Sequence, residues 1–492
     1  MTEKVMINRL PSGVVGLDDV LGGGIPEYSF NLVAGGPGCG KTTLAHQIVF
    51  ANATPERPAL YISVLGEPPI KMLRYQQQFS FFDAAKLRDA ISFVHLGQQA
   101  LEGGLSQVLA SIMKAVDHAN PRMVVVDSFR AVIRRSKSQP DGERDLQRFV
   151  QRLALHLTSY QATTFLVGEY VERETDNNAV FTVADGIMWL YQAIERNSMV
   201  RKIQVIKMRG QNQLPGLHTA RITEHGMHIF PRLSKPEEGS AVAVAAAAER
   251  NRLSTGVQAL DEMLGGGIPM GYTALLAGPS GSGKTVLANQ FLLEGARQGE
   301  RGIVAIFERR PNDYLETTPQ ARDFARMVQN QTLEVLYLRP LDLSIDETLV
   351  ALRDAVLRTG AKRAVIDSLS GLELALAPTF RADFRESLYR MLGALTSLGV
   401  TVLATVELTD SYTDFRMSPQ DVSFLTDAVI IQRYVEVDGM LKRVMSVVKV
   451  RASQHSKALR EYEITSNGVE ILPTALGRYD GLLTGRPQIR QS

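Results

Sequence analysis

The chain has 492 residues, of which 45% are hydrophobic and 22% charged, and its formal net charge is +2. This length suggests roughly two to four globular domains, and the charge provides no strong attraction to nucleic acid or anionic membranes. The longest apolar run is Ala241–Ala248, the N-terminus lacks the apolar core of a signal peptide, and Cys39 is the single cysteine. These features exclude a membrane-spanning helix, an internal disulfide and a multi-cysteine zinc site, so we expect a cytoplasmic protein.

The first predicted elements return in a second copy. Gly16–Pro26 reads GLDDVLGGGIP, and Ala259–Pro269 reads ALDEMLGGGIP at an offset of 243 residues (259 − 16). More than half of the positions from 9 to 45 are identical to their partners at this offset. Similarity of this length at a fixed spacing indicates an internal duplication.

The duplication predicts two domains of similar fold. The proposed divisions are a first domain at 1–232, a linker at 233–249, a second domain at 250–473 and a flexible tail at 474–492. Within each domain, short apolar runs such as ALYISVL and RGIVAIF alternate with helical stretches. Runs that are apolar on both faces and are separated by helices predict an α/β fold with a largely parallel sheet flanked by helices.

Each half carries a glycine-rich loop between an apolar strand and a helix. Gly35–Thr42 and Gly278–Thr285 both match the pattern G-x-x-x-x-G-K-[ST]. Backbone N–H groups of such loops cradle phosphates, while the lysine neutralises the β and γ oxygens. We therefore predict two ATP sites with Lys41 and Lys284 as catalytic lysines. The other predicted loop contacts are Gly36, Pro37, Gly38, Cys39, Gly40, Thr42, Thr43, Pro279, Ser280, Gly281, Ser282, Gly283, Thr285 and Val286.

An aspartate ends an apolar strand in each half. Asp127 follows MVVV and Asp367 follows RAVI, so both carboxylates are expected beside the phosphate loops at the carboxyl edge of the sheet. Together with Thr42 and Thr285, they are the predicted Mg²⁺ ligands. A strand-end aspartate can instead cap a turn, but the phosphate loop upstream favours the metal role.

With these features, the chain resembles the KaiC family of RecA-like ATPases over both halves. The shared motifs are the lead-ins, the phosphate loops, the Asp-Ser strand ends, KMRG at Lys207–Gly210 and its counterpart KVRA at Lys449–Ala452. The resemblance implies two tandem RecA-like P-loop NTPase domains and a homohexamer of two stacked rings, with ATP between neighbouring subunits. In the family, the basic residues of this K-x-R motif reach the next subunit's nucleotide. The corresponding residues here are Lys207, Arg209, Lys449 and Arg451, with His455 also expected near the nucleotide. Without the resemblance, an exposed strand with alternating charge would explain these basic residues.

The sequence departs from the family at a pair of adjacent glutamates, the first of which helps to activate the attacking group. In the second half, Glu308 keeps this position and Arg309 replaces its neighbour; in the first half, Leu65 matches Glu308 and Glu67 lies two positions later. We therefore name Glu308 and Glu67 as catalytic candidates and predict that the second site does most of the hydrolysis. Two further carboxylates that could substitute end the next strands, Glu169 and Glu407.

Clock members of the family phosphorylate themselves on an adjacent Ser-Thr pair that precedes a Thr-Asp. Ser423 matches the serine here, but Phe424 replaces the threonine. Ser423 therefore keeps serine autokinase activity open, while a two-site phosphorylation cycle is not expected.

The function favoured by the sequence is a hexameric Mg-ATPase in signalling or stress regulation, with ATP and Mg²⁺ as cofactors and unidentified regulatory protein partners. One alternative is a DNA-dependent ATPase of the recombinase or helicase class. Against it stand the near-neutral charge and the absence of a recognisable DNA-binding module or long basic stretch. Another alternative is a nucleotide-gated scaffold with little turnover, which the missing glutamates would allow.

Overall fold

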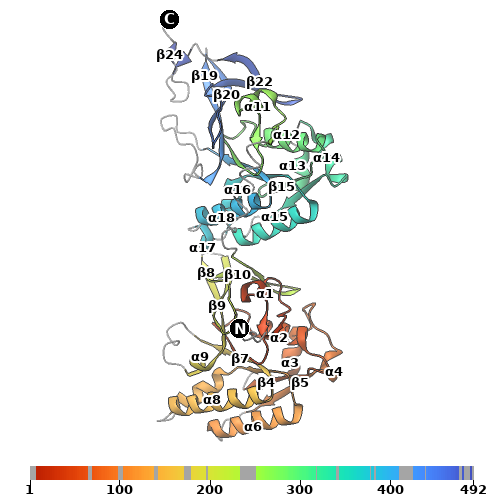
Figure 1. Ribbon diagram of the computed structural model, residues 1–492, viewed down its shortest axis with the longest axis vertical. Helices are drawn as coiled ribbons and strands as arrows, with labels where there is room; N and C mark the ends of the chain where they lie inside the picture. Colours follow the sequence, from red (N-terminus) through yellow and green to blue (C-terminus); the bar gives the residue numbers. More distant parts are fainter. Residues whose placement is uncertain are drawn as a thin grey trace, which may run out of the picture. The chain divides into compact units, whose positions relative to one another are not determined.

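The computed structural model divides into two compact units, Met1–Arg232 and Leu233–Ser492, which are described separately below (Figure 1). The structure describes residues 7–64, 69–97, 104–137, 142–170, 179–195, 198–232, 251–316, 319–338, 343–376, 378–381, 384–408, 425–437, 439–475, 479–480 and 488–489.

In the described part of the first unit, nine strands form one sheet in the order β11-β10-β9-β8-β3-β7-β6-β4-β5. Neighbours from β8 to β5 are parallel, whereas those from β8 to β11 are antiparallel. The strands are β3 (Phe30–Gly35), β4 (Ala59–Val64), β5 (Ile91–Leu96), β6 (Met123–Asp127), β7 (Thr163–Glu169), β8 (Gly186–Glu195), β9 (Ser198–Met208), β10 (His218–Thr223) and β11 (Gly226–Phe230).

The sheet of the second unit repeats this topology over its described residues, in the order β16-β15-β17-β18-β14-β19-β20-β21-β22. Neighbouring strands are parallel from β16 to β19 and antiparallel from β19 to β22. The strands are β14 (Thr273–Gly278), β15 (Gly302–Ile306), β16 (Leu333–Tyr337), β17 (Arg363–Asp367), β18 (Thr401–Glu407), β19 (Ala428–Val437), β20 (Met440–Val450), β21 (Arg460–Thr465) and β22 (Gly468–Ala475).

Helices cover both faces of each sheet. In the first unit they are α1 (Leu17–Leu21), α2 (Lys41–Asn52), α3 (Pro69–Gln76), α4 (Lys86–Asp89), α6 (Gly104–Ala119), α7 (Arg130–Lys137), α8 (Gly142–Ser159) and α9 (Ala179–Val183). In the second they are α11 (Gln258–Met263), α12 (Lys284–Arg297), α13 (Pro311–Glu316), α14 (Ala321–Gln329), α15 (Ile345–Thr359), α16 (Leu369–Ala375), α17 (Pro378–Arg381) and α18 (Phe384–Ser397).

Two apolar cores, one on each face, hold each unit together. Helix α2 packs with one face of the first sheet, while α6 and α8 contribute to the core on the other. Helix α12 and the pair α15 and α18 have these roles in the second unit (Figure 1). All residues of β3 and β14 are buried, as expected of central parallel strands covered on both faces. The predicted fold of two tandem, largely parallel α/β domains is confirmed.

Short elements flank the sheets. The duplicated lead-ins form the antiparallel pairs β1 (Arg9–Leu10) with β2 (Ile25–Pro26) and β12 (Arg252–Leu253) with β13 (Ile268–Pro269). Within the segment predicted as a tail, β23 (Tyr479–Asp480) pairs with β24 (Gln488–Ile489). The predicted linker, 233–249, lies outside the described residues.

Candidate active site

The phosphate loops follow the carboxyl ends of the central strands β3 and β14. Each loop ends in a glycine whose left-handed backbone leads into the next helix, with φ of 103° at Gly40 and 94° at Gly283. A Cβ atom at Gly283 would lie 2.7 Å from Cδ1 of Ile464. Both the backbone conformation and the available space therefore require glycine at the point where the helix N-terminus faces the loop.

The two predicted catalytic lysines lie within their own loops. Lys41 Nζ donates a hydrogen bond to the Gly36 carbonyl at 2.6 Å, and Lys284 Nζ donates to the carbonyls of Pro279 at 2.7 Å and Gly278 at 2.8 Å. Burial lowers the pKa of Lys284, while the negative charges of nearby carboxylates oppose this shift. These carboxylates are Glu407, Asp367 and Glu308. The ammonium group thus lies where it can meet phosphate oxygens.

A threonine and an aspartate meet beside each loop. Thr42 Oγ1 donates to Oδ2 of Asp127 at 2.8 Å, and Thr285 Oγ1 donates to Oδ2 of Asp367 at the same distance. Among the described residues, no group of three or more His, Cys, Asp or Glu side chains could hold a metal alone. One carboxylate and one hydroxyl fit Mg²⁺, which prefers oxygen ligands and usually shares its shell with water and substrate phosphates.

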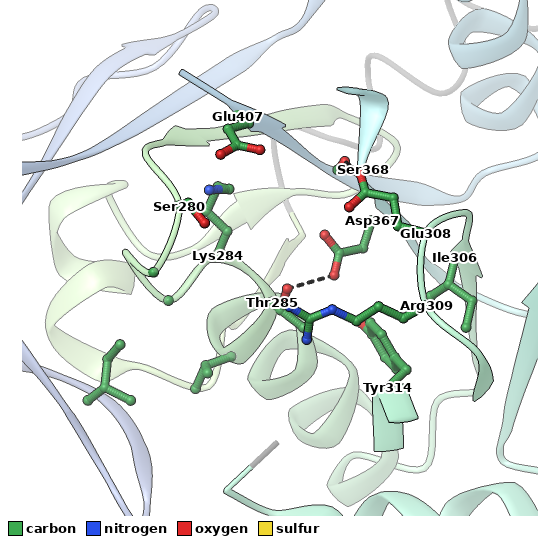
Figure 2. A pocket seen from close by; sticks show the side chains of 14 residues that line it. Ser280, Lys284, Thr285, Ile306, Glu308, Arg309, Tyr314, Asp367, Ser368 and Glu407 are labelled. Carbon is green, nitrogen blue, oxygen red and sulfur yellow. Dashed lines mark hydrogen bonds between the residues drawn. The ribbon is translucent and has the colours of Figure 1, made fainter. Parts of the chain in front are cut away.

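The second domain has a pocket of about 280 Å³ above its phosphate loop (Figure 2). Lys284 and Thr285 enter it from the start of α12, Asp367 from the end of β17, and Glu407 from the end of β18. Glu308 lines the same pocket two residues beyond the end of β15. The strand ends thus bring together the Lys284 ammonium group, the hydrogen-bonded Thr285–Asp367 pair and two further carboxylates.

Glu308 is held in place by its neighbours in this pocket. Ser368 Oγ donates to Oε1 of Glu308 at 3.1 Å and accepts a hydrogen bond from the Gly371 backbone N–H at 2.9 Å. A Cβ atom at Gly371 would lie 2.6 Å from the same Oε1. Arg309, which replaces the second glutamate, also lines the pocket. The carboxylate is therefore oriented by Ser368 within the pocket that Thr285 and Asp367 also line.

The first site is described in part. Glu67 and Leu65 lie outside the described residues, so the distance of Glu67 from the first phosphate loop is not defined. Glu169 ends β7, opposite Gly35 in the parallel register. Burial raises the pKa of Asp127, whereas hydrogen bonds from Tyr61 and Thr42 act in the opposite direction.

The first K-x-R motif lies at the opposite end of the sheet from its own phosphate loop. Arg209 forms an ion pair with Asp185 at 3.0 Å, and the same aspartate accepts a hydrogen bond from the backbone N–H of Phe30. Phe30 is the first residue of the six-residue strand β3, and the phosphate loop follows the last. At roughly 3.3 Å per residue, Arg209 is about 16 Å or more from that loop. Lys207 lies at the same end, with Nζ 3.5 Å from the Thr182 carbonyl.

The second motif repeats this placement. Arg451 pairs with Asp427 at 3.2 Å, and Asp427 accepts a hydrogen bond from the N–H of Thr273 at the start of β14. Lys449 Nζ donates to the Thr426 carbonyl at 2.6 Å. The Nδ1 atom of His455 is buried without a hydrogen-bond partner in the described part of the chain. Neither motif is near the phosphate loop of its own domain.

Comparisons with known proteins agree with this geometry. The KaiC ATPase family profile matches residues 10–234 and 253–475. The chain belongs to the KaiC family of ATPases. The circadian clock oscillator protein KaiC of Picosynechococcus sp. is 28% identical over 491 residues, covering 98% of this chain and 92% of the relative. KaiC 1 of Synechocystis sp. is 29% identical over 495 residues with the same coverage. KaiC of Prochlorococcus marinus is 26% identical over 495 residues, covering 99% of this chain and 97% of its own length.

Membership of the KaiC family establishes a nucleotide-using ATPase with a duplicated domain. No helix in the described ranges is long and apolar enough to cross a membrane. The predicted phosphate acceptor, Ser423, lies outside the described residues, as does Phe424. The Thr426-Asp427 pair that follows is described, and it precedes β19 at the end of the sheet where Lys449 and Arg451 lie.

The sequence analysis missed several polar side chains around the two strand-end aspartates, Asp127 and Asp367. Tyr61 donates to Asp127 at 2.7 Å, Thr405 donates to Asp367 at 2.5 Å, and Ser368 supports Glu308. Each is a hydroxyl-bearing residue in or next to an apolar strand. A hydroxyl-bearing residue in or next to an apolar strand was the signal that the sequence offered for these contacts, because a buried hydroxyl needs a hydrogen-bond partner.

Proposed function

We propose that this chain is a Mg²⁺-dependent ATPase that binds ATP in both domains and hydrolyses it mainly in the second. The observation that carries this proposal is the second pocket, where Lys284, the Thr285–Asp367 pair and Glu308 line one cavity. The first domain has the matching lysine and Thr–Asp pair, but Leu65 in place of Glu308. ATP binding and ATP hydrolysis therefore need not occur equally in the two domains.

The residues of the second pocket divide the chemistry among them. The loop N–H groups and Lys284 bind the phosphate oxygens, and Thr285 and Asp367 hold the Mg²⁺. Bound Mg²⁺ neutralises charge on the β and γ oxygens during phosphoryl transfer. Glu308, oriented by the hydrogen bond from Ser368, orients the attacking water and accepts its proton.

The same proposal includes a homohexamer with ATP at the subunit interfaces. The K-x-R residues lie at the start of β3 and β14, whereas the phosphate loops follow the ends of these strands. Lys207, Arg209, Lys449 and Arg451 therefore cannot serve the nucleotide of their own domain, which supports their action on a neighbouring subunit. His455, whose buried Nδ1 atom has no partner among the described residues, is assigned to the same interface.

Two extensions complete the proposal. The first is autophosphorylation of Ser423, with the ATP of the second domain as donor, motivated by its position three residues before Thr426-Asp427. The second is a role in the cytoplasm, in signalling or stress regulation, through protein partners rather than nucleic acid. The near-neutral net charge and the single cysteine support this setting.

One set of measurements tests the proposal against its alternatives. Phosphate release would be followed with Mg-ATP, with and without single-stranded DNA, for the full-length chain and for Lys284→Ala. We expect turnover that needs Mg²⁺, is unaffected by DNA and is mostly lost in the variant. Stimulation by DNA would indicate a recombinase or helicase. Tight ATP binding without turnover would indicate a nucleotide-gated scaffold.

A further inference from the structure

The metal aspartate of the first domain has a second hydroxyl donor besides its phosphate-loop threonine. The phenol of Tyr61, on β4, donates to Oδ2 of Asp127 at 2.7 Å, the atom that also accepts from Thr42 at 2.8 Å. Tyr61 is fully buried. Burial and the Asp127 charge both raise its pKa far above the ordinary value, so its proton remains available for donation.

The orientation of this tyrosine is fixed by the phosphate-loop helix. The ring of His46, on α2, stacks on Tyr61 with centroids 4.4 Å apart, and His46 Nδ1 donates to the Thr42 carbonyl at 2.8 Å. Burial lowers the pKa of His46 to about 4, which keeps the stacked ring uncharged near neutral pH. Tyr61, His46 and Thr42 thus form one packed group behind Asp127.

The second domain supports its aspartate from another strand. Thr405, on β18, donates to Oδ1 of Asp367 at 2.5 Å, while Thr285 donates to Oδ2 at 2.8 Å. Thr405 pairs with Leu276 in the register of β18 with β14. The equivalent pairing of β7 with β3 joins Val167 to Val33, and Val167 also lies directly opposite Asp127. Val167 is therefore the first-domain counterpart of Thr405.

The opposite difference occurs on the strand at the other side of each aspartate. Ser63 pairs with Asp127 and Ile306 pairs with Asp367, so Tyr61 corresponds to Val304. On the two strands that flank the aspartate, the first domain thus has Tyr61 on β4 and Val167 on β7. The second domain has Val304 on β15 and Thr405 on β18. Each hydroxyl donates to the aspartate of its own domain, Tyr61 to Oδ2 of Asp127 and Thr405 to Oδ1 of Asp367. A role in packing alone would not require a hydroxyl in either place.

The second domain also has a buried tyrosine, but it comes from a helix. Tyr314, on α13, donates to Oδ1 of Asn289 at 2.8 Å, and Asn289 matches His46 at the offset of 243 (289 − 46). The nearby Asp367 carboxylate helps to raise the pKa of Tyr314, after burial as the larger cause. In both domains, this position of the phosphate-loop helix therefore contacts a buried tyrosine near the metal aspartate.

We propose that Tyr61 is a positioning residue for Mg²⁺ in the first domain. Tyr61 and Thr42 converge on Oδ2 of Asp127, and no donor among the described residues reaches Oδ1. The carboxylate is thereby held with Oδ1 available to the metal or its water shell. Partners of metal ligands typically change metal affinity by roughly 10–100-fold when they are removed. This inference rests on the proposed role of Asp127 in binding Mg²⁺.

The test measures metal-dependent nucleotide binding rather than hydrolysis. Full-length protein carrying Lys284→Ala is used so that nucleotide binding reports on the first site. The fluorescence of N-methylanthraniloyl-ATP is then measured as Mg²⁺ is added. Adding Tyr61→Phe should raise the half-saturating Mg²⁺ concentration by roughly tenfold, the low end of the range for such partners.

A matched control removes a similar hydrogen bond far from the site. Tyr160, a partly buried tyrosine, donates to Oδ1 of Asp117 at 2.5 Å, and Tyr160→Phe should leave the Mg²⁺ titration unchanged. Thermal unfolding without nucleotide shows whether each variant is folded. A Tyr61→Phe protein that is folded but keeps the parent Mg²⁺ dependence would overturn the positioning role.

Asp127→Asn separates this proposal from the one on which it rests. If Asp127→Asn raises the half-saturating Mg²⁺ concentration but Tyr61→Phe does not, then only the positioning role fails. If Asp127→Asn has no effect, the metal role of Asp127 fails as well. When both proposals hold, Tyr61→Phe should have no further effect on Mg²⁺ binding in the Asp127→Asn background, because Tyr61 acts through Asp127.

Discussion

The hydroxyl of Ser368 donates a hydrogen bond to Oε1 of Glu308 at 3.1 Å. Ser368 directly follows Asp367 at the end of β17, whereas Glu308 lies two residues past the neighbouring strand β15. The contact therefore joins the ends of two adjacent strands and orients a carboxylate toward the pocket that Lys284 enters. In the first domain, the sequence has Leu65 at the position matching Glu308.

Glu308→Gln should retain ATP binding but lose at least about tenfold in phosphate release, since a positioned general base contributes roughly 10²–10⁴ in rate. The substitution preserves the size of the side chain and removes its ability to take a proton. Glu463→Gln, at an exposed position of β21, is the matched control and should be neutral. Nearly full activity of Glu308→Gln, combined with loss in Glu67→Gln, would assign hydrolysis to the first domain instead.

The two phosphate-loop lysines should have different effects when removed. Lys41→Ala should chiefly impair assembly, because it weakens the binding of ATP, which we propose holds neighbouring subunits together. Lys284→Ala should abolish most phosphate release and leave assembly largely intact. Light scattering after gel filtration in Mg-ATP should give about 325 kDa for the wild type, six times the 54.1 kDa chain. A wild-type monomer at micromolar protein and saturating Mg-ATP would rule out the hexamer.

Arg451 should act on the pocket of a neighbouring subunit. Separately, Arg451→Ala and Glu308→Gln should each be nearly inactive. Mixed at equal amounts before assembly, they should recover about a quarter of wild-type turnover, because random neighbours restore that share of pockets. A mixture of Glu308→Gln with Lys284→Ala is the control, since both changes affect the same subunit's side of the pocket. If the mixture of Arg451→Ala with Glu308→Gln recovers no more activity than this control, action between subunits is contradicted.

Ser423 should accept one phosphate. Incubation with Mg-ATP followed by intact-mass measurement should show a gain of a single phosphate, because Phe424 removes the adjacent acceptor. Ser423→Ala should prevent the gain, whereas Ser418→Ala, five residues upstream (423 − 418), should not. Label that persists in Ser423→Ala would place the acceptor elsewhere.

His218 should make the first domain sensitive to acid. Its Nδ1 accepts a hydrogen bond from the Arg232 N–H at 2.8 Å, while Nε2 lies 3.2 Å from the Leu214 carbonyl, so the native ring is neutral. Burial lowers the pKa of His218 from its ordinary value. The unfolded chain therefore takes up a proton near pH 6.5 while the folded one does not, and stability falls as pH decreases below that value.

Urea unfolding between pH 7.5 and 5.5 measures this effect. His218→Gln should reduce the pH dependence of the unfolding midpoint of the first domain. His225→Gln serves as the control, because His225 is exposed and its loss should leave the pH dependence unchanged. If the unfolding midpoint of His218→Gln keeps the wild-type pH dependence, another group causes the acid sensitivity.

The elements that bind phosphate were predictable because their information is local. The G-x-x-x-x-G-K-T pattern specifies a loop conformation, and a lone aspartate after four apolar residues indicates a strand end. The supporting hydroxyls were less accessible, since Tyr61 reaches Asp127 only through the register of β4 with β6. Tyr314 reaches the vicinity of Asp367 from a helix that has no such register.

The location of the basic motifs was also beyond local sequence reasoning. The resemblance implied that Arg209 contacts a neighbouring subunit, but the residues alone favoured an exposed strand with alternating charge. Its distance from the first phosphate loop depends on the antiparallel pairing of β8 with β9 and the parallel pairing of β8 with β3. These long-range pairings determine which end of the sheet carries the arginine.

The separation of Arg209 and Arg451 from their own phosphate loops gives each domain a polarity, with nucleotide held at one end of the sheet and the arginine presented at the other. In the proposed hexamer, contacts between such subunits would therefore be head-to-tail, so that the ring closes with a single direction. A subunit that fails to fold its β19–β20 hairpin would damage its neighbour's pocket while keeping its own phosphate loop intact. In a mixed ring, each such subunit would disable one pocket, that of its neighbour, so activity should fall in proportion to the fraction of defective chains.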